Sequence, residues 1–143
     1  MSDLTILTVP VFSALCNLAF NLRRDVFVIE QRVPPELEND NEDLTAIHMV
    51  AIQDGDVCGT LRIVKRPEHY KIGRVAVGRA FRGRGIAKAM MLKAMADHAD
   101  SAKGRFYLTA QTDKVSLYEK LGFKAFGQQF MDAGIPHLAM KNY

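Results

Sequence analysis

The chain has 143 residues, of which 48% are hydrophobic and 24% are charged, and its formal net charge is +3. This is the composition of an ordinary globular protein, and the length suits a single domain over residues 1–143 with one hydrophobic core. No apolar run reaches the roughly 18 residues of a membrane span, and no basic stretch precedes a long apolar one near the N-terminus, so we expect no membrane partner and a cytoplasmic location.

The first half of the chain is predicted to form a strand, a helix and a hairpin. Residues 4–9 form the short first strand, and residues 13–30 form a helix that two successive prolines end. Its predicted apolar face repeats at steps of three and four residues and consists of Leu15, Leu18, Leu22, Val26 and Ile29. After an acidic loop or short helix, residues 46–53 and 57–65 are strands joined by the turn Asp-Gly-Asp.

The second half is predicted to contain four strands and two helices. The strands are residues 70–77, 105–110, 124–130 and 137–143, and the helices are residues 83–100 and 114–121. This order predicts an α+β fold with a mostly antiparallel sheet, in which the helix after residue 77 permits one parallel connection.

The two cysteines, Cys16 and Cys58, fall in a predicted helix and a predicted strand. They form neither a Cys-x-x-Cys pair nor the pattern of a disulfide framework, so we expect reduced thiols in the core. We expect no metal site.

The charges are unevenly distributed along the chain. Six acids and one base lie between Glu30 and Asp43, whereas residues 69–96 carry seven bases and no acid. The acids either attract a cationic amine or form a solvated loop. The bases surround a glycine-rich loop, which indicates a polyanionic ligand, a solvated basic face or a nucleic-acid surface.

That loop, Arg82-Gly83-Arg84-Gly85, stands between a predicted strand and a predicted helix. Free N–H groups at a helix start and its positive dipole end form an anion site, and glycines allow a phosphate to approach the backbone. With Arg82 and Arg84, such a loop would hold a pyrophosphate. The sequence contains neither the P-loop pattern nor the third glycine of the dinucleotide fingerprint, where Lys88 stands.

The loop matches Arg-x-x-Gly-x-Ala at Arg82, Gly85 and Ala87, after the strand IGRVAV and before the element SLYEKLGF at residues 116–123. On these motifs the chain resembles the GNAT superfamily of acyl-CoA-dependent N-acyltransferases. The resemblance implies a mixed, mostly antiparallel sheet of six or seven strands flanked by about four helices, with acyl-CoA bound where the fourth strand leads into its crossover helix.

The resemblance also implies which residues hold the cosubstrate, acetyl-CoA. The loop would bind the pyrophosphate, and the strand end would pair with the pantetheine arm while the Val77 N–H polarises the thioester carbonyl. The implied cofactor-binding residues are Val75, Ala76, Val77, Arg82, Gly83, Arg84, Gly85, Ile86 and Ala87.

Three residues are candidates for the catalytic steps. Tyr118 matches the general acid of the family, and its alternative role is that of a core tyrosine. His137 lies in a Pro-His-x-x-Met segment similar to that of the glyphosate N-acetyltransferase branch, whose histidine is the base. Glu30 is the rival base, acting through water. An imidazole suits proton transfer near neutral pH.

The predicted acceptor is the primary amine of a small molecule, or of a lysine or a protein N-terminus, attacking directly in a ternary complex. The glyphosate branch has an arginine where this chain has Gln111, which argues against glyphosate. Phe12, Phe20 and Phe27 are predicted to lie in the core rather than in a pocket.

Two other functions stay open. A non-catalytic acyl-CoA-binding regulator would use the same fold. A nucleic-acid-binding module ranks third because the bases lack interleaved aromatic residues, so we expect no nucleic-acid partner. Many members of the superfamily are dimers, and a homodimer is possible here.

Overall fold

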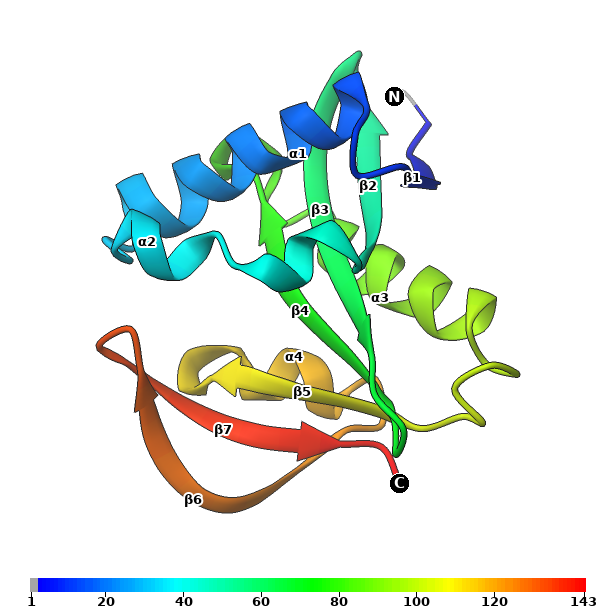
Figure 1. The fold of residues 1–143 in the computed structure, drawn as a ribbon, viewed down its shortest axis with the longest axis vertical. Helices are drawn as coiled ribbons and strands as arrows, with labels where there is room; N and C mark the ends of the chain where they lie inside the picture. The colour runs from blue at the N-terminus through cyan, green and yellow to red at the C-terminus, as the bar shows by residue number, and fades with distance from the viewer. Residues whose placement is uncertain (1–2) are drawn as a thin grey trace.

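The structure, a computed structural model, describes residues 3–143 and contains one seven-stranded sheet in the order β1-β2-β3-β4-β5-β7-β6 (Figure 1). The strands are β1 (Thr5–Val9), β2 (Ile47–Gln53), β3 (Asp56–Lys65), β4 (Tyr70–Val77), β5 (Phe106–Gln111), β6 (Lys124–Asp132) and β7 (Ile135–Lys141). All neighbouring strands are antiparallel except β4 and β5, which are parallel. The predicted mixed, mostly antiparallel sheet is confirmed.

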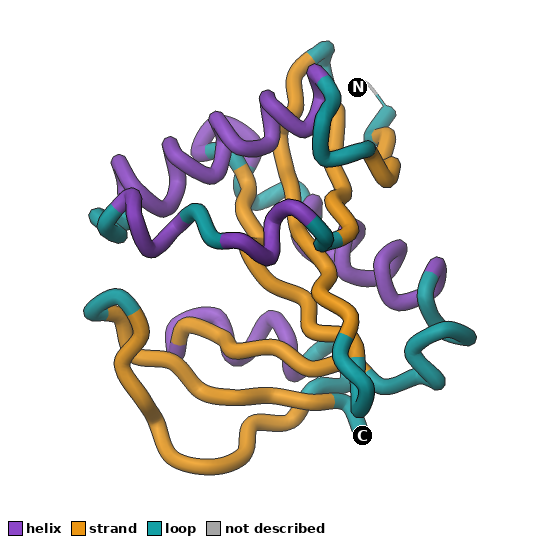
Figure 2. The backbone as a smooth tube through the Cα atoms, in the orientation of Figure 1, coloured by secondary structure: helices purple, strands orange, loops and turns teal. Residues whose placement is uncertain are grey.

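Helices cover both faces of the sheet (Figure 2). They are α1 (Ala14–Arg23), the π-helix η1 (Arg24–Glu30), α2 (Pro35–Glu38), α3 (Ile86–Asp97) and α4 (Val115–Glu119), with short 3₁₀ turns η2 (Asn41–Leu44), η3 (Arg79–Phe81) and η4 (Thr112–Lys114). The segment from α1 to α2 lies on one face, and α3 and α4 lie on the other. The main core lies between α3, α4 and the sheet, and both cysteines are buried and free, as predicted.

The predicted helix over residues 13–30 is divided in two. The Ser13 side chain caps α1 by accepting a hydrogen bond from the Cys16 N–H at 3.2 Å, but after Arg23 the backbone widens into η1. Two members of the predicted apolar face, Leu18 and Ile29, are 48% and 62% exposed. The buried stripe instead includes Arg23, which only the fold shows to be an interior residue.

The predicted helix over residues 83–100 also needs correction, because α3 begins three residues later and ends three residues earlier. Gly83 and Gly85 have φ angles of +79° and +76°, which lie in the left-handed region and cannot continue a right-handed helix. Gly85 is the N-cap, so the glycine-rich segment is a loop that leads into the helix.

The parallel strands β4 and β5 are paired only at their beginnings. The register joins Tyr70 to Phe106 and Lys71 to Tyr107, and no further pair follows. Beyond these pairs the strands separate, as Figure 1 shows. The second half of β4 therefore has a strand partner on its β3 side only, and this separation creates the space for a site.

Within residues 3–143, no helix combines the length and the hydropathy needed to cross a membrane.

Candidate functional site

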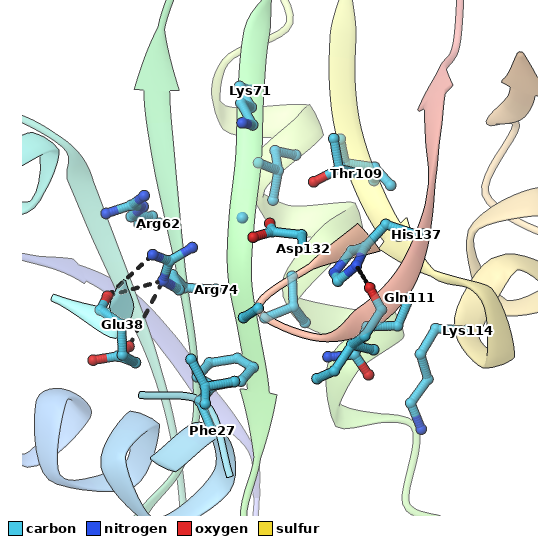
Figure 3. A pocket seen from close by; sticks show the side chains of 18 of the residues that line it. Phe27, Glu38, Arg62, Lys71, Arg74, Thr109, Gln111, Lys114, Asp132 and His137 are labelled. Carbon is cyan, nitrogen blue, oxygen red and sulfur yellow. Dashed lines mark hydrogen bonds and ion pairs between the residues drawn. The ribbon is translucent and has the colours of Figure 1, made fainter. Parts of the chain in front are cut away.

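A cavity of about 200 Å³ lies where β4 and β5 separate, under the segment from η1 to α2. Strands β3 to β7, helix α4 and that covering segment all contribute side chains to it (Figure 3). Two of the predicted catalytic residues, Tyr118 and His137, line this cavity. The fold thus brings together side chains from residues 118 and 137 that belong to different elements.

Tyr118 is carried by α4 and is 8% exposed. The turn after α4 fixes its position. The Phe123 N–H donates to the Tyr118 carbonyl oxygen at 3.1 Å, and the Phe123 ring packs edge-on against the Tyr118 ring, with 6.4 Å between the ring centroids. Burial raises the pKa of Tyr118 to about 12. Its hydroxyl forms no hydrogen bond with any of residues 3–143, so it is a neutral donor that faces the cavity without a protein partner.

His137 lies inside β7, opposite Gln111 of β5 and Phe130 of β6, and is not the first residue of the strand, as the predicted range 137–143 had it. Its Nδ1 is 2.7 Å from the Ile135 carbonyl oxygen. Because a carbonyl only accepts hydrogen bonds, Nδ1 must carry the proton, and the Nε2 of the neutral ring keeps its lone pair. The Phe130 ring stacks on the imidazole at 5.9 Å. These contacts give His137 the tautomer that a proton acceptor needs.

Glu30, the rival base, does not line the cavity. Its carboxylate accepts two hydrogen bonds from the Arg82 guanidinium, at 2.6 and 2.8 Å, and Arg79 is 3.8 Å away. The hydrogen bonds from Arg82 lower the pKa of Glu30. The structure therefore separates Glu30 from Tyr118 and His137 and joins it to the arginine-glycine loop.

The side chains of the two loop arginines are held by the protein. Besides Glu30, Arg82 binds the Val77 carbonyl oxygen through Nε at 3.0 Å. Arg84 donates to Gln53 at 3.0 Å and lies over the Phe81 ring at 4.9 Å.

The backbone of the same loop is different. Within the described chain, the N–H groups of Gly85, Ile86 and Ala87 have no backbone acceptor. They stand at the positive end of the α3 dipole. Of the predicted cofactor-binding residues, Val75 lines the cavity, while Ala76 and Ile86 are buried at 3% and 2% exposure. The loop thus offers amide groups, rather than arginine side chains, to an anion.

Three acids of the segment between residues 30 and 43, Glu38, Asp40 and Asp43, are paired with arginines that lie far from them in the sequence. Arg23, which is 1% exposed, binds Glu38 at 2.6 Å and Asp43 at 2.8 Å. Arg62 binds Asp40 at 2.6 Å and Asp43 at 2.9 Å. We call these five residues the ionic brace. It holds the covering segment against β3, so these acids are neither a solvated loop nor free to attract a cation.

The three phenylalanines of the first helical region have three different environments. Phe20 packs against the small core under α1, as predicted. Phe12 is 85% exposed, and Phe27 lines the cavity, so the predicted core position is wrong for Phe12 and incomplete for Phe27. The position of Phe27 at the cavity was not predicted, because the widened turn of η1 changes which residues share a face.

Comparison with known proteins identifies the family. Residues 16–143 match the domain described as the acetyltransferase (GNAT) domain. The chain belongs to the GNAT family. An uncharacterised N-acetyltransferase of Bacillus subtilis, YjcF, is 35% identical over 123 residues, covering 85% of this chain and 88% of that protein.

Solved structures of GNAT proteins have the same fold. An acyl-CoA N-acyltransferase from Pseudomonas aeruginosa has a TM-score of 0.86 at 28% identity, covering 100% of both chains. Escherichia coli ElaA has a TM-score of 0.86 at 27% identity, again covering 100% of both. A GNAT acetyltransferase from Elizabethkingia anophelis, solved with acetyl-CoA bound, shares the fold with a TM-score of 0.71 at 15% identity and 97% coverage of each chain.

The resemblance inferred from the loop motif is therefore confirmed at the level of the GNAT superfamily. The protein is an enzyme, an acyltransferase that uses an acyl-CoA and transfers acetyl groups. The similarity of the last strand to the glyphosate N-acetyltransferase branch stays a prediction.

Proposed function

We propose that residues 1–143 form a single domain that transfers the acetyl group of acetyl-CoA to the primary amine of a small molecule. The amine attacks the thioester directly in a ternary complex. The observation that carries this proposal is that one cavity contains both a proton acceptor, His137, and a neutral hydrogen-bond donor, Tyr118. The acetyl-CoA bound to the fold neighbour from Elizabethkingia anophelis supports the choice of donor.

The backbone of β4 and of the loop before α3 suits two parts of acetyl-CoA, the pantetheine arm and the pyrophosphate. The free N–H groups of Gly85, Ile86 and Ala87 would bind the pyrophosphate with the help of the α3 dipole. The second half of β4, which has no partner on its β5 side, would pair with the pantetheine amides like an added strand. The Val77 carbonyl already accepts from Arg82, but a carbonyl oxygen has two lone pairs and can accept a second bond.

The chemical step requires that a proton leave the amine and that charge be stabilised on two atoms. His137 Nε2 takes the proton while the nitrogen–carbon bond forms. The Val77 N–H stabilises the carbonyl oxygen as it becomes negative, and one such donor contributes about 3–4 kcal/mol in other enzymes. The carbon–sulfur bond then breaks, and coenzyme A leaves as a thiolate.

Tyr118 assists the departure of the thiolate in a specific way. Its pKa of about 12 is higher than that of an ordinary thiol, near 8.5, so complete transfer of its proton to the sulfur is unfavourable. A hydrogen bond from the Tyr118 hydroxyl to the developing thiolate is favourable because a charged acceptor strengthens it. We therefore assign Tyr118 as the hydrogen-bond donor to the leaving group.

The cavity favours a small acceptor over a protein side chain. Its volume of about 200 Å³ is below the roughly 300–1,000 Å³ of pockets for drug-sized ligands, and α2 and η1 cover it. A free amine with few heavy atoms fits such a space.

The test combines ligand stabilisation with turnover. Acetyl-CoA at about 100 times its dissociation constant should stabilise the protein by roughly 2.7 kcal/mol, visible as a raised melting temperature. Coenzyme A should do the same, whereas ATP, NAD and a DNA duplex should not. Release of the coenzyme A thiol in the presence of small amines would establish acetyl transfer. Stabilisation without thiol release from any amine would indicate a regulator, and stabilisation by DNA alone would indicate a nucleic-acid-binding module.

A further inference from the structure

Most of the charged groups that line the cavity are already paired. Arg62 and Asp40 bind each other, and Glu38 binds Arg23. Arg74 donates to the Leu37 carbonyl at 3.2 Å and to the Glu38 carbonyl at 3.0 Å. The cavity arginines therefore use their donors on the protein and leave few for a ligand.

Three charged side chains in the cavity lining lack such partners. Within residues 3–143, Lys71, Lys114 and Asp132 form no ion pair and no side-chain hydrogen bond. Lys114 is exposed at the end of η4, where solvent screens its charge. Lys71 is half-buried and Asp132 is exposed. Lys71 and Asp132 are thus the charges available to a bound acceptor.

Lys71 has the features of an anion-binding group. Burial lowers the pKa of its ammonium, and the acid with the largest influence on it, Glu42, is bound to Arg66 at 2.7 Å. An ammonium that is partly removed from water without a counter-ion is unfavourable until an anion arrives. No carboxylate of residues 3–143 forms an ion pair with this ammonium, which leaves it available to an anionic ligand.

The fold places this lysine and the proposed base at different positions along the same cavity. Lys71 belongs to the last register pair before β4 and β5 separate, so it stands at the closed end of the gap. Asp132, the last residue of β6, pairs with Ile135, the first residue of β7, across the turn between the two strands. His137 follows Ile135 by two residues. In Figure 3 the side chains of Lys71, Asp132 and His137 surround the same space.

From this arrangement we propose that the acceptor is a small primary amine whose other end carries an oxyanion, such as a carboxylate or a phosphonate. Lys71 binds the oxyanion, and Asp132 receives the ammonium beside His137. The ammonium releases one proton to solvent to become the attacking amine, and His137 Nε2 takes the second as the nitrogen–carbon bond forms. The inference rests on the acetyl transfer proposed above and adds the class of the acceptor. A polycationic acceptor does not fit, because the three acids of the ionic brace are matched by three arginines, Arg23, Arg62 and Arg74.

The experiment measures thiol release from acetyl-CoA with β-alanine and 4-aminobutyrate, each compared with its uncharged amide, and with 1,3-diaminopropane. The two acids should have a kcat/KM about 10- to 100-fold higher than their amides, the range expected for one charge-assisted contact. Lys71→Met should raise KM for the acids by a similar factor, leave kcat nearly unchanged, and leave the amides unaffected. Lys71→Arg should restore part of the preference.

The control is Lys93→Met, which removes the same charge from the exposed face of α3, where Lys93 pairs with Asp97 at 3.0 Å. It should leave the kinetics of both series unchanged. Asp132→Asn should raise KM for acids and amides alike, since both carry the ammonium.

The outcomes separate this inference from the proposed function. Turnover of amides or of the diamine as efficient as that of the acids overturns the inference alone. If no amine is acetylated, the proposed function fails. The inference is then decided by the melting temperature of the protein with coenzyme A, measured with and without each acid. Stabilisation by the acids that Lys71→Met abolishes sustains the oxyanion site, and stabilisation that Lys71→Met leaves intact, or none at all, overturns it.

Discussion

The ionic brace and the cavity it borders are both rich in polar side chains, but they differ in how completely those side chains are paired. In the brace, Arg23 and Arg62 each bind two carboxylates. In the cavity, the Tyr118 hydroxyl and the Nε2 of His137 have no hydrogen-bond partner among residues 3–143. Fully paired groups fix the structure, whereas unpaired groups beside a cavity are available for chemistry. The comparison therefore predicts that brace variants change stability and that cavity variants change rate.

The largest effect should come from the centre of the brace. Arg23→Met leaves Glu38 and Asp43 buried without their main counter-ion, and removing one partner of a buried ion pair costs about 3–5 kcal/mol. Urea unfolding should show this loss. Arg24→Met, one residue further on and exposed, is the matched control and should change stability by less than about 0.5 kcal/mol. Equal stability of the two variants would contradict a structural role for the brace.

Removal of the proposed base should change the rate and not the stability. His137→Gln should lower kcat/KM by about 10²- to 10³-fold and abolish the decline of activity on the acid side, because that decline reports protonation of the imidazole. A pH–rate profile checks this. His69→Gln is the control, since His69 does not line the cavity. Its Nδ1 is 2.7 Å from the Tyr143 hydroxyl oxygen, and its ring stacks on that of Tyr107 with 4.6 Å between the centroids. An unchanged acid limb in His137→Gln would transfer the role to another group.

The leaving-group donor should have a slightly smaller effect. Tyr118→Phe should reduce kcat by about 10²-fold, typical of one lost hydrogen bond to a developing charge, while acetyl-CoA affinity stays the same. The melting temperature should hold or rise, because the variant removes a buried hydroxyl that has no protein partner. Single-turnover kinetics and calorimetry measure the two quantities. Tyr107→Phe, outside the cavity lining, should be neutral in both, and full activity of Tyr118→Phe would remove it from the mechanism.

The smallest effect concerns the outer part of the brace at low pH. The hydrogen bonds from Arg62 lower the pKa of Asp40 from 3.8 to about 2. A carboxyl whose pKa is depressed by folding stabilises the protein above its unfolded pKa, and this stabilisation disappears as the pH falls from about 4 to about 2. Asp40→Asn should thus cost about 1 kcal/mol at pH 7, after allowance for solvent screening, and progressively less towards pH 2.

Urea unfolding at several pH values measures this difference. Glu36→Gln, an exposed acid of the same segment with no ion pair in the described chain, should show no such pH dependence. A stability difference for Asp40→Asn that stays constant with pH would contradict the assignment.

The sequence predicted the sheet and the loop because both depend on local signals. Each of these signals spans only a few residues: the short strand segments, the Asp-Gly-Asp turn and the glycines before α3. The sequence did not predict features that depend on a residue far away in the chain. The burial of Arg23 depends on its ion pairs with Glu38 and Asp43, which are 15 and 20 residues away. The position of Lys71 at the cavity depends on the separation of β4 and β5 beside it.

The candidate catalytic residues divide along the same line. Motifs near Tyr118 and His137 indicated their chemistry, but only the register of β5, β6 and β7 brings His137 to the cavity. Glu30 was proposed because residues 23–38 resemble the segment that lines the acceptor side in many small bacterial members of the superfamily. The sequence gives no sign that Arg82, 52 positions away, would bind it.

The separation of β4 from β5 gives this sheet an edge in its interior as well as the two at its rim. A rim edge is exposed to other chains and invites aggregation. The interior edge lies under the segment from η1 to α2, beside a cavity of only about 200 Å³. Its amides should therefore exchange with solvent faster than those of the flanking strands in the free protein. A pantetheine arm would close the edge and slow that exchange, so hydrogen exchange along a central strand would report occupancy.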